Sequence, residues 1–279
     1  MAWSIDPDPV SGTADLKAPP ERDDVVRRLR AAGCVFAEEE TDIVLSTTSD
    51  PAVIERMVAR RSTGVPLEHV VGWAAFCGER VIVEPGVFVP RRRSEFLVRC
   101  VLEIVGSMSV VVDLCCGSGA IGAVISRRVP GVELWAVDID SSAVRCARRN
   151  ISGAVGAVGA VGAVLQGDLD EPLPIRLLGH VDVLVANAPY VPTDEIRWLP
   201  AEARLHEPIW TLDGGHDGVE IQRRVAALAP RWLSPTGSVV IETSRQQSQQ
   251  TSAAVTAAGF RAIVLGDEDT DATVVVGRA

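Results

Sequence analysis

The stretch Val111-Val112-Asp113-Leu114-Cys115-Cys116-Gly117-Ser118-Gly119-Ala120-Ile121 decides the fold of this chain. A short apolar run contains an aspartate near its end, small residues follow, and a second apolar run begins directly after Gly119. This order predicts a strand, a tight turn and a helix. Glycines at such a turn let the backbone bend sharply and approach a ligand closely. The pattern is typical of a site for a nucleoside cofactor.

Downstream of this stretch, apolar runs of strand length alternate with helical patterns. The predicted strands cover 110–114, 133–138, 163–166, 181–186, 237–242, 260–265 and 272–277. Alternation of this kind predicts an α/β fold of Rossmann-like type, with a mostly parallel seven-stranded sheet covered by helices on both faces. Because only a short link joins the last two strands, we expect the last strand to be antiparallel to its neighbour.

The chain divides into four predicted segments. Prolines predict a disordered tail over 1–20, and residues 21–73 form a small helical module, with one helix over 21–32 and another that starts at Asp50-Pro51. Residues 74–90 form a hairpin linker with Pro85-Gly86 at the turn, between strands near 79–83 and 87–89. The remaining segment, 91–279, is expected to form the main domain, whose first helix is expected to be capped by Ser94.

Composition limits the class of protein. The chain has 279 residues and a formal net charge of −10, which disfavours nucleic acid as a partner. Its six cysteines show no spacing typical of metal ligands, so we expect reduced thiols, no metal and a cytoplasmic location. We also expect no signal peptide and no membrane-spanning segment. The Gly-Ala-Val repeat from Gly153 to Val164 is expected to be a surface link that leads into a strand.

Three acidic residues mark the ends of three successive predicted strands. Asp113 could hold loop amides or the ammonium group of a ligand, and Asp138, 19 residues beyond Gly119, suits the ribose hydroxyls. Asp168 could accept from an adenine amino group, and Leu169 could pack on the base. NAD is the competing cofactor, but the loop lacks the third glycine of GxGxxG. S-adenosylmethionine, which has no pyrophosphate, is therefore favoured.

A second motif, Asn187-Ala188-Pro189-Tyr190, follows the predicted strand 181–186. Ligands of open α/β sheets bind at the carboxyl ends of strands. The Asn187 side-chain carbonyl and the next backbone carbonyl could accept two hydrogen bonds from a planar NH2 group. Pro189 would hold the turn, and Tyr190 could stack on the substrate. The alternative interpretation is an ordinary turn, since Asn and Pro are common in turns.

This motif resembles the (N/D)PPY signature of amino-methylating class I methyltransferases. Within that group, the chain is similar to the protein N5-glutamine methyltransferases, which modify release factors. The resemblance covers roughly residues 22–279. The stretch Pro66-Leu67-Glu68-His69-Val70-Val71-Gly72 resembles the family's entry into its hairpin, and Val89-Pro90-Arg91-Arg92-Arg93-Ser94-Glu95 resembles its PRPETE segment. Glu207-Pro208, followed by Gly214-Gly215 and Asp217-Gly218, resembles its EP…GG.DG stretch.

The resemblance implies a site and a reaction. Asn187, Ala188, Pro189 and Tyr190 would be the catalytic residues. The cofactor-binding residues would be Asp113, Cys115, Gly117, Gly119, Asp138, Asp168, Leu169, Asn187 and Arg91. Arg91 could instead touch an acidic loop of the substrate. The implied reaction moves a methyl group from S-adenosylmethionine to a glutamine amide nitrogen in a Gly-Gly-Gln loop of a release factor, and we expect a monomer.

The chain departs from the family pattern at several positions. Cys115 stands where the family has its first glycine, Arg92 and Arg93 replace a proline and an acid, and Ala188 replaces the first proline of NPPY. These departures leave methyl transfer in place but put the substrate in doubt. The competing hypotheses are an amino methyltransferase acting on nucleic acid, one acting on a small molecule, and a cofactor-binding module without catalysis.

Overall fold

The computed structural model describes residues 20–152 and 162–279. The chain divides into two compact units, Met1–Val71 and Gly72–Ala279, which are described separately. The predicted tail, apart from its last residue, lies outside the described residues, and so does most of the Gly-Ala-Val repeat. Among the described residues, no helix has the length and apolar character needed to cross a bilayer.

The first unit is helical. Its helices are α1 (Arg22–Ala31), α2 (Ala37–Thr47), α3 (Pro51–Ser62) and α4 (Leu67–Val71). The apolar faces of α1, α2 and α3 meet in one core, in which Leu29, Val44 and Val58 are fully buried. Asp50 caps α3 by accepting from the Ala52 amide at 2.8 Å, as an aspartate before a first-turn proline should.

The second unit begins with a hairpin that lies earlier than predicted. Strands β1 (Trp73–Phe76) and β2 (Glu79–Ile82) pair antiparallel around a turn at Cys77 and Gly78, which both have positive φ. The expected turn at Pro85-Gly86 is wrong for the hairpin, since it only follows β2. A two-residue hairpin turn needs positive φ at its centre, and Cys77 gives no sign of it in the sequence.

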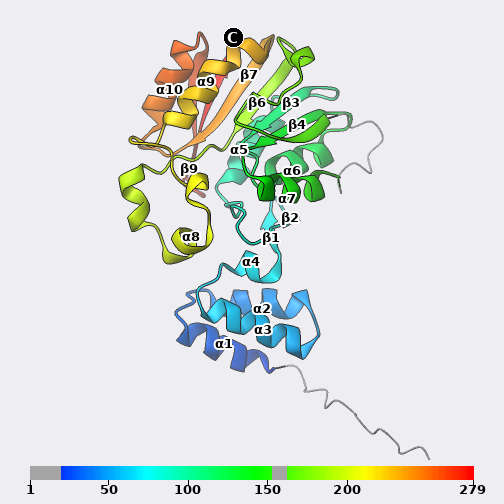
Figure 1. Ribbon diagram of the computed structural model, residues 1–279, viewed down its shortest axis with the longest axis vertical. Coiled ribbons are helices and arrows are strands. Elements are labelled where there is room, and N and C mark those ends of the chain that lie inside the picture. The colour runs from blue at the N-terminus through cyan, green and yellow to red at the C-terminus, as the bar shows by residue number, and fades with distance from the viewer. Residues whose placement is uncertain (1–19, 153–161) are drawn as a thin grey trace, which may run out of the picture. The chain divides into compact units, whose positions relative to one another are not determined.

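A seven-stranded sheet forms the body of this unit (Figure 1). Its strands are β3 (Val110–Leu114), β4 (Glu133–Asp138), β5 (Gly162–Gln166), β6 (Val181–Ala186), β7 (Leu233–Thr243), β8 (Arg261–Asp267) and β9 (Ala272–Arg278). Their order is β5-β4-β3-β6-β7-β9-β8. The first five strands pair parallel, and β9 lies antiparallel between β7 and β8. The predicted fold class is confirmed, including the antiparallel last strand.

Helices cover both faces of the sheet because side chains along each strand alternate between two cores. Val111 faces a core shared with α5 (Ser94–Leu102), α6 (Ala120–Arg128) and α7 (Ser141–Ser152). Val112, the next residue, faces a core shared with α9 (Glu220–Trp232) and α10 (Ser248–Ala257). Strands buried on both faces read as continuous apolar runs, which explains why the sequence showed them clearly.

The connection between β6 and α9 is irregular. It contains η2 (Thr193–Trp198), α8 (Ala201–His206) and η3 (Ile209–Thr211), and the remaining short helix, η1 (Ile175–Leu177), precedes β6. This connection starts at the Asn187 motif, and Figure 1 shows it extending from the sheet as a separate arm. Because the connection follows β6, it starts at the carboxyl edge of the sheet. The chain order of the strands reverses there, between β3 and β6.

Candidate active site

The turn between β3 and α6 has the backbone shape that a close ligand requires. Cys115, Gly117 and Gly119 all have left-handed φ, at 57°, 55° and 75°. A side chain on Gly119 would place its Cβ 2.8 Å from the Ala147 Cβ of α7, so this glycine permits close packing of the two helices. Cys115 adopts the same conformation as a non-glycine residue, which costs about 1–2 kcal/mol.

Asp138, at the end of β4, ties this turn to the sheet. Its Oδ2 accepts from the Gly117 amide at 2.8 Å, and its Oδ1 accepts from the Asp140 amide at 2.9 Å. Burial raises the pKa of the Asp138 carboxyl, while the two backbone amides oppose the rise. Since each carboxylate oxygen can accept two hydrogen bonds, Asp138 retains capacity for ligand hydroxyls.

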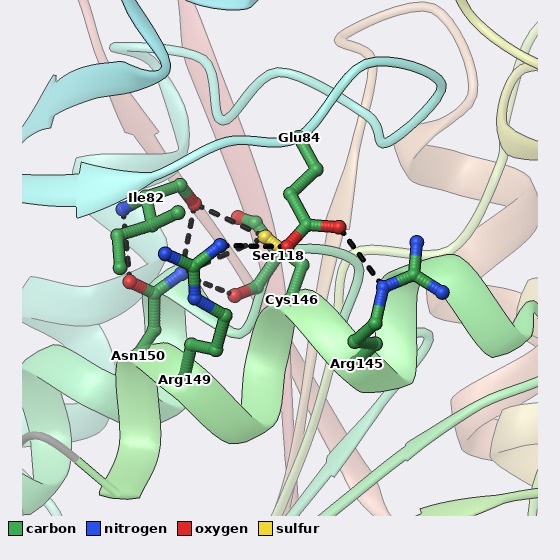
Figure 2. A network of polar contacts seen from close by, with 7 residues as sticks. All are labelled: Ile82, Glu84, Ser118, Arg145, Cys146, Arg149 and Asn150. Carbon is green, nitrogen blue, oxygen red and sulfur yellow. Dashed lines mark hydrogen bonds and ion pairs between the residues drawn. The ribbon is translucent and has the colours of Figure 1, made fainter.

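A buried asparagine, which was not predicted from the sequence, also holds this turn (Figure 2). Asn150 Nδ2 donates to the carbonyls of Ser118 and Ile82, both at 2.8 Å, and Asn150 Oδ1 accepts from the Ile82 amide at 2.8 Å. Nearby, Arg145 and Arg149 pair with Glu84 at 3.1 and 2.8 Å. The hairpin, α7 and the turn between β3 and α6 are thus linked by one side chain.

Asp113 lies fully buried in β3, below the turn. Its Oδ2 accepts from the Gly122 amide at 3.2 Å, so it holds the start of α6. Its Oδ1 is buried without a partner among the described residues. Burial raises the pKa of Asp113 to about 7, and the charge of Asp138 adds to the rise. A buried acceptor without a donor is consistent with a cationic group of a cofactor binding close by.

Asp168 follows β5, so the three predicted acids do lie at neighbouring strand ends. Its Oδ2 pairs with Arg224 at 2.8 Å. Leu169 has a φ of 49° and packs into the core beside Val137. The structure therefore gives both residues a structural partner, and their contact with an adenine ring stays a prediction.

At the end of β6, Asn187 points its amide group in a defined direction. Asn187 Nδ2 donates to Ser94 Oγ at 3.0 Å. Within residues 20–152 and 162–279, neither Asn187 Oδ1 nor the Ala188 carbonyl accepts a hydrogen bond. Ser94 was expected to cap α5, but the N-cap is Arg93, and the Ser94 hydroxyl binds Asn187 instead. Two acceptors are thus available side by side along the chain.

Tyr190 is held from three directions. The Arg93 guanidinium lies 5.6 Å from the centre of the Tyr190 ring, and the Tyr190 hydroxyl lies 3.5 Å from Glu242 Oε1. The Tyr190 carbonyl accepts from Gln247 Nε2 at 2.8 Å, and the same Gln247 Nε2 also donates to the Asp217 carbonyl at 3.1 Å. Burial raises the pKa of the Tyr190 hydroxyl, so this group stays protonated at neutral pH.

Arg91 is bound to the irregular connection. Its guanidinium pairs at 2.7 Å with both carboxylate oxygens of Glu207, which is buried, and Glu207 also accepts from the Val89 amide at 3.2 Å. The pair fastens residues 89–91 to residue 207. Contact between Arg91 and a cofactor carboxylate stays a prediction.

Four polar residues that support the site were not predicted from the sequence: Asn150, Glu207, Glu242 and Gln247. Two of them had a usable signal. Glu207 belongs to the Glu207-Pro208 motif of the family resemblance, and Glu242 follows the apolar run Val239-Val240-Ile241 just as Asp138 ends its own strand. Asn150 lies on α7, where a polar residue ordinarily faces water, and Gln247 is the residue directly before α10.

Comparison with known proteins agrees with the fold. The family model for the methyltransferase small domain matches residues 79–205. A methyltransferase from Pyrococcus furiosus has a similar fold, with a TM-score of 0.56 at 15% identity, covering 79% of this chain and 98% of the other. The fold and the matched domain define the class as that of the methyltransferases. The curated relatives confirm the predicted N-methyltransferase activity and its cofactor, S-adenosylmethionine.

The sequence relatives narrow the class to a family. A release factor glutamine methyltransferase of Streptomyces coelicolor is 38% identical over 198 residues, covering 70% of this chain and 68% of the relative. A 4-amino-L-phenylalanine/4-methylamino-L-phenylalanine methyltransferase of Streptomyces pristinaespiralis is 32% identical over 228 residues, with 79% and 75% covered. The chain belongs to the release factor glutamine methyltransferase family.

Proposed function

We propose that this enzyme transfers a methyl group from S-adenosylmethionine to the side-chain amide nitrogen of a glutamine in a peptide chain release factor. The observation that carries the proposal is the pair of available acceptors, Asn187 Oδ1 and the Ala188 carbonyl, at the sheet edge where the order reverses. The family relation to enzymes with that activity supports it.

The chemical difficulty lies in the nitrogen, whose lone pair is delocalised into its carbonyl. When bound, the cofactor supplies an electrophilic methyl group. Asn187 Oδ1 and the Ala188 carbonyl would each accept a hydrogen bond from one N–H group of the substrate amide. Together they would direct the nitrogen toward that methyl. Such alignment can contribute up to about 7–11 kcal/mol in ideal cases. The acceptors also favour positive charge as it develops on nitrogen, before one proton leaves to water.

Cofactor binding is proposed for Asp113, Cys115, Gly117, Gly119, Asp138, Asp168, Leu169 and Arg91. Asp138 and the backbone of the turn would bind the ribose and the amino-acid part, because they are fixed to each other by the Gly117 amide. Replacing Asp138 by Ala should weaken S-adenosylmethionine binding, measured by calorimetry, much more than replacing Asn187.

Protein recognition is proposed for the helical unit and for the arm after β6. Val35 and Phe36 of the first unit are 82% and 65% exposed, and Trp198 and Trp210 of the arm are 75% and 54% exposed. Large exposed apolar side chains are common where a protein partner binds. A paired Val35→Ser and Phe36→Ser variant should raise KM for a protein substrate but not for a short peptide. Ile175→Ser, at an equally exposed site, is the control.

A small aromatic amine is the second candidate substrate. It is favoured by the aminophenylalanine methyltransferase among the relatives and by the position of Arg93 beside Tyr190. The N–H groups of an amine would donate hydrogen bonds to the same two acceptors, Asn187 Oδ1 and the Ala188 carbonyl. The two candidates differ in the size of the substrate.

The test is mass spectrometry of reaction products. Purified enzyme and cofactor are incubated with a release factor that contains the Gly-Gly-Gln loop, and separately with 4-amino-L-phenylalanine. We expect one added methyl on the glutamine, and transfer reduced about a hundredfold or more in Asn187→Ala with cofactor affinity nearly unchanged. Methylation of the amino acid alone would select the second candidate. Methylation of neither would overturn both.

We further propose that the enzyme acts in the cytoplasm as a monomer. Release factors take part in translation, which places enzyme and substrate together. Sedimentation of the purified protein should give the mass of one chain, 29.7 kDa, at micromolar concentration.

A further inference from the structure

A carboxylate that the mechanism above does not use lies beside the site. Glu242, near the end of β7, is 1% exposed. Glu242 Oε1 lies 3.5 Å from the Tyr190 hydroxyl, and Glu242 Oε2 is buried without a hydrogen-bond partner among the described residues. Burying a carboxyl group in this way is costly, so its presence next to Tyr190 calls for a functional explanation.

Two residues at the start of α5 also face Glu242. The Ser94 hydroxyl and the Arg93 charge both favour its ionised form, and so does the Tyr190 hydroxyl, while burial has the largest effect and raises the pKa. Among the described residues, Val274 of β9 pairs with Glu242, and Gln222 of α9 donates to the Glu242 backbone carbonyl at 3.3 Å; neither side chain is charged.

Ser94 is a neighbour that Glu242 and the Asn187 side chain share. Ser94 Oγ accepts a hydrogen bond from Asn187 Nδ2 at 3.0 Å. A serine hydroxyl has one proton to donate. If that proton points to the carboxylate of Glu242, Ser94 can only accept from Asn187, and the asparagine must turn Nδ2 toward Ser94 and Oδ1 away from it.

We propose that Glu242 is a positioning residue which, through Ser94, fixes the Asn187 side chain with its oxygen toward the substrate nitrogen. This inference rests on the proposed function, in which Asn187 Oδ1 accepts a hydrogen bond from an N–H group of the substrate. The two ends of an asparagine amide have nearly the same shape, so only the surrounding hydrogen bonds decide which end faces the site.

Protonation of Glu242 removes this selection. A neutral carboxyl group can donate its own proton to Ser94 Oγ. The Ser94 hydroxyl can then donate to Asn187 Oδ1, which stabilises the opposite orientation of the amide. Methyl transfer should therefore fall as pH falls through the raised pKa of Glu242, while cofactor binding is retained.

The experiment compares the wild-type enzyme with Glu242→Gln, in which shape is kept and the charge is lost. We expect kcat for methyl transfer to fall at least tenfold, the dissociation constant of S-adenosylmethionine to change less than twofold, and the acid limb of kcat to disappear. Adding Ser94→Ala to the Glu242→Gln variant should lower kcat little further. Ser94→Thr in the otherwise wild-type enzyme should keep activity, because the hydroxyl is retained. Glu133→Gln, a partly buried carboxylate paired with Arg176, should match the wild type.

A second readout needs no substrate. The side-chain amide NMR signal of Asn187, assigned by its loss in Asn187→Asp, should titrate with pH in the wild type and not in Glu242→Gln. Titration in both proteins, or in neither, overturns the positioning role. Titration in the wild type alone supports that role even if glutamine is not methylated, so this failure and failure of the proposed function give different results.

Discussion

Replacing Asn150 by alanine should destabilise the second unit by about 3 kcal/mol. The change removes three hydrogen bonds of 2.8 Å that connect α7 to Ser118 and to both backbone groups of Ile82. Each contributes about 1 kcal/mol net, and the loss is larger where the backbone partner stays buried and unpaired. Since Asn150 is 2% exposed, water cannot easily replace it.

The measurement is thermal and urea-induced unfolding of the full chain, followed for the second unit by near-ultraviolet circular dichroism. For a unit of this size, about 3 kcal/mol lowers Tm by roughly 6–12 °C. The matched control is Glu84→Gln, which breaks the pairs with Arg145 and Arg149 on the same helix. Those arginines are exposed, so the control should cost under about 1 kcal/mol. Equal losses in the two variants, or a loss below about 0.5 kcal/mol for Asn150→Ala, would refute the role of Asn150 in holding the turn between β3 and α6.

Three further predictions concern the same edge of the sheet. Cys115→Gly should leave unfolding free energy unchanged or raise it by up to about 1 kcal/mol, because relief of the left-handed conformation outweighs the added chain entropy; a clear loss in urea unfolding would contradict this. Asp113 binds a proton more tightly when folded, with a pKa of about 7, so stability should fall as pH rises from about 4 to 7. In Asp113→Asn that slope in Tm against pH should be smaller, and an unchanged slope would show that another group titrates. Glu207→Gln should lower the free energy of unfolding by about 1–3 kcal/mol, which is less than the loss of a fully buried ion pair, because Arg91 is partly exposed. Calorimetry that finds no change would mean that the pair of Arg91 and Glu207 contributes nothing to stability.

Much of this fold could be predicted because the strands are buried on both faces. Continuous apolar runs gave β3, β4 and β6 their observed bounds. The start of β7 was missed, because Val181 pairs with Leu233 while Val183 pairs with Ser238, and an irregular register leaves no periodic pattern. The helix α2 was missed as well, since its three acidic residues in the first turn obscure a narrow apolar face.

The placement of the candidate site residues was predictable where they stand at the ends of strands. Asp113, Asp138 and Asn187 lie at the expected edge of the sheet, and their roles toward cofactor and substrate stay predictions. Ser94 was assigned the wrong task, because whether its hydroxyl caps a helix or binds a residue 93 positions away depends on tertiary structure. Such long-range side-chain bonds have no local signal in a single sequence.

The insertion of β9 between β7 and β8 has a consequence for synthesis on the ribosome. Until residues 272–278 emerge, the edge of β7 that β9 will occupy has its backbone groups unpaired, although β6 can already pair with the other edge. Open strand edges invite association with other chains. The nascent protein should therefore depend on chaperones late in translation, and ribosome-bound chains stopped before residue 272 should aggregate more readily than those stopped after the strand has emerged.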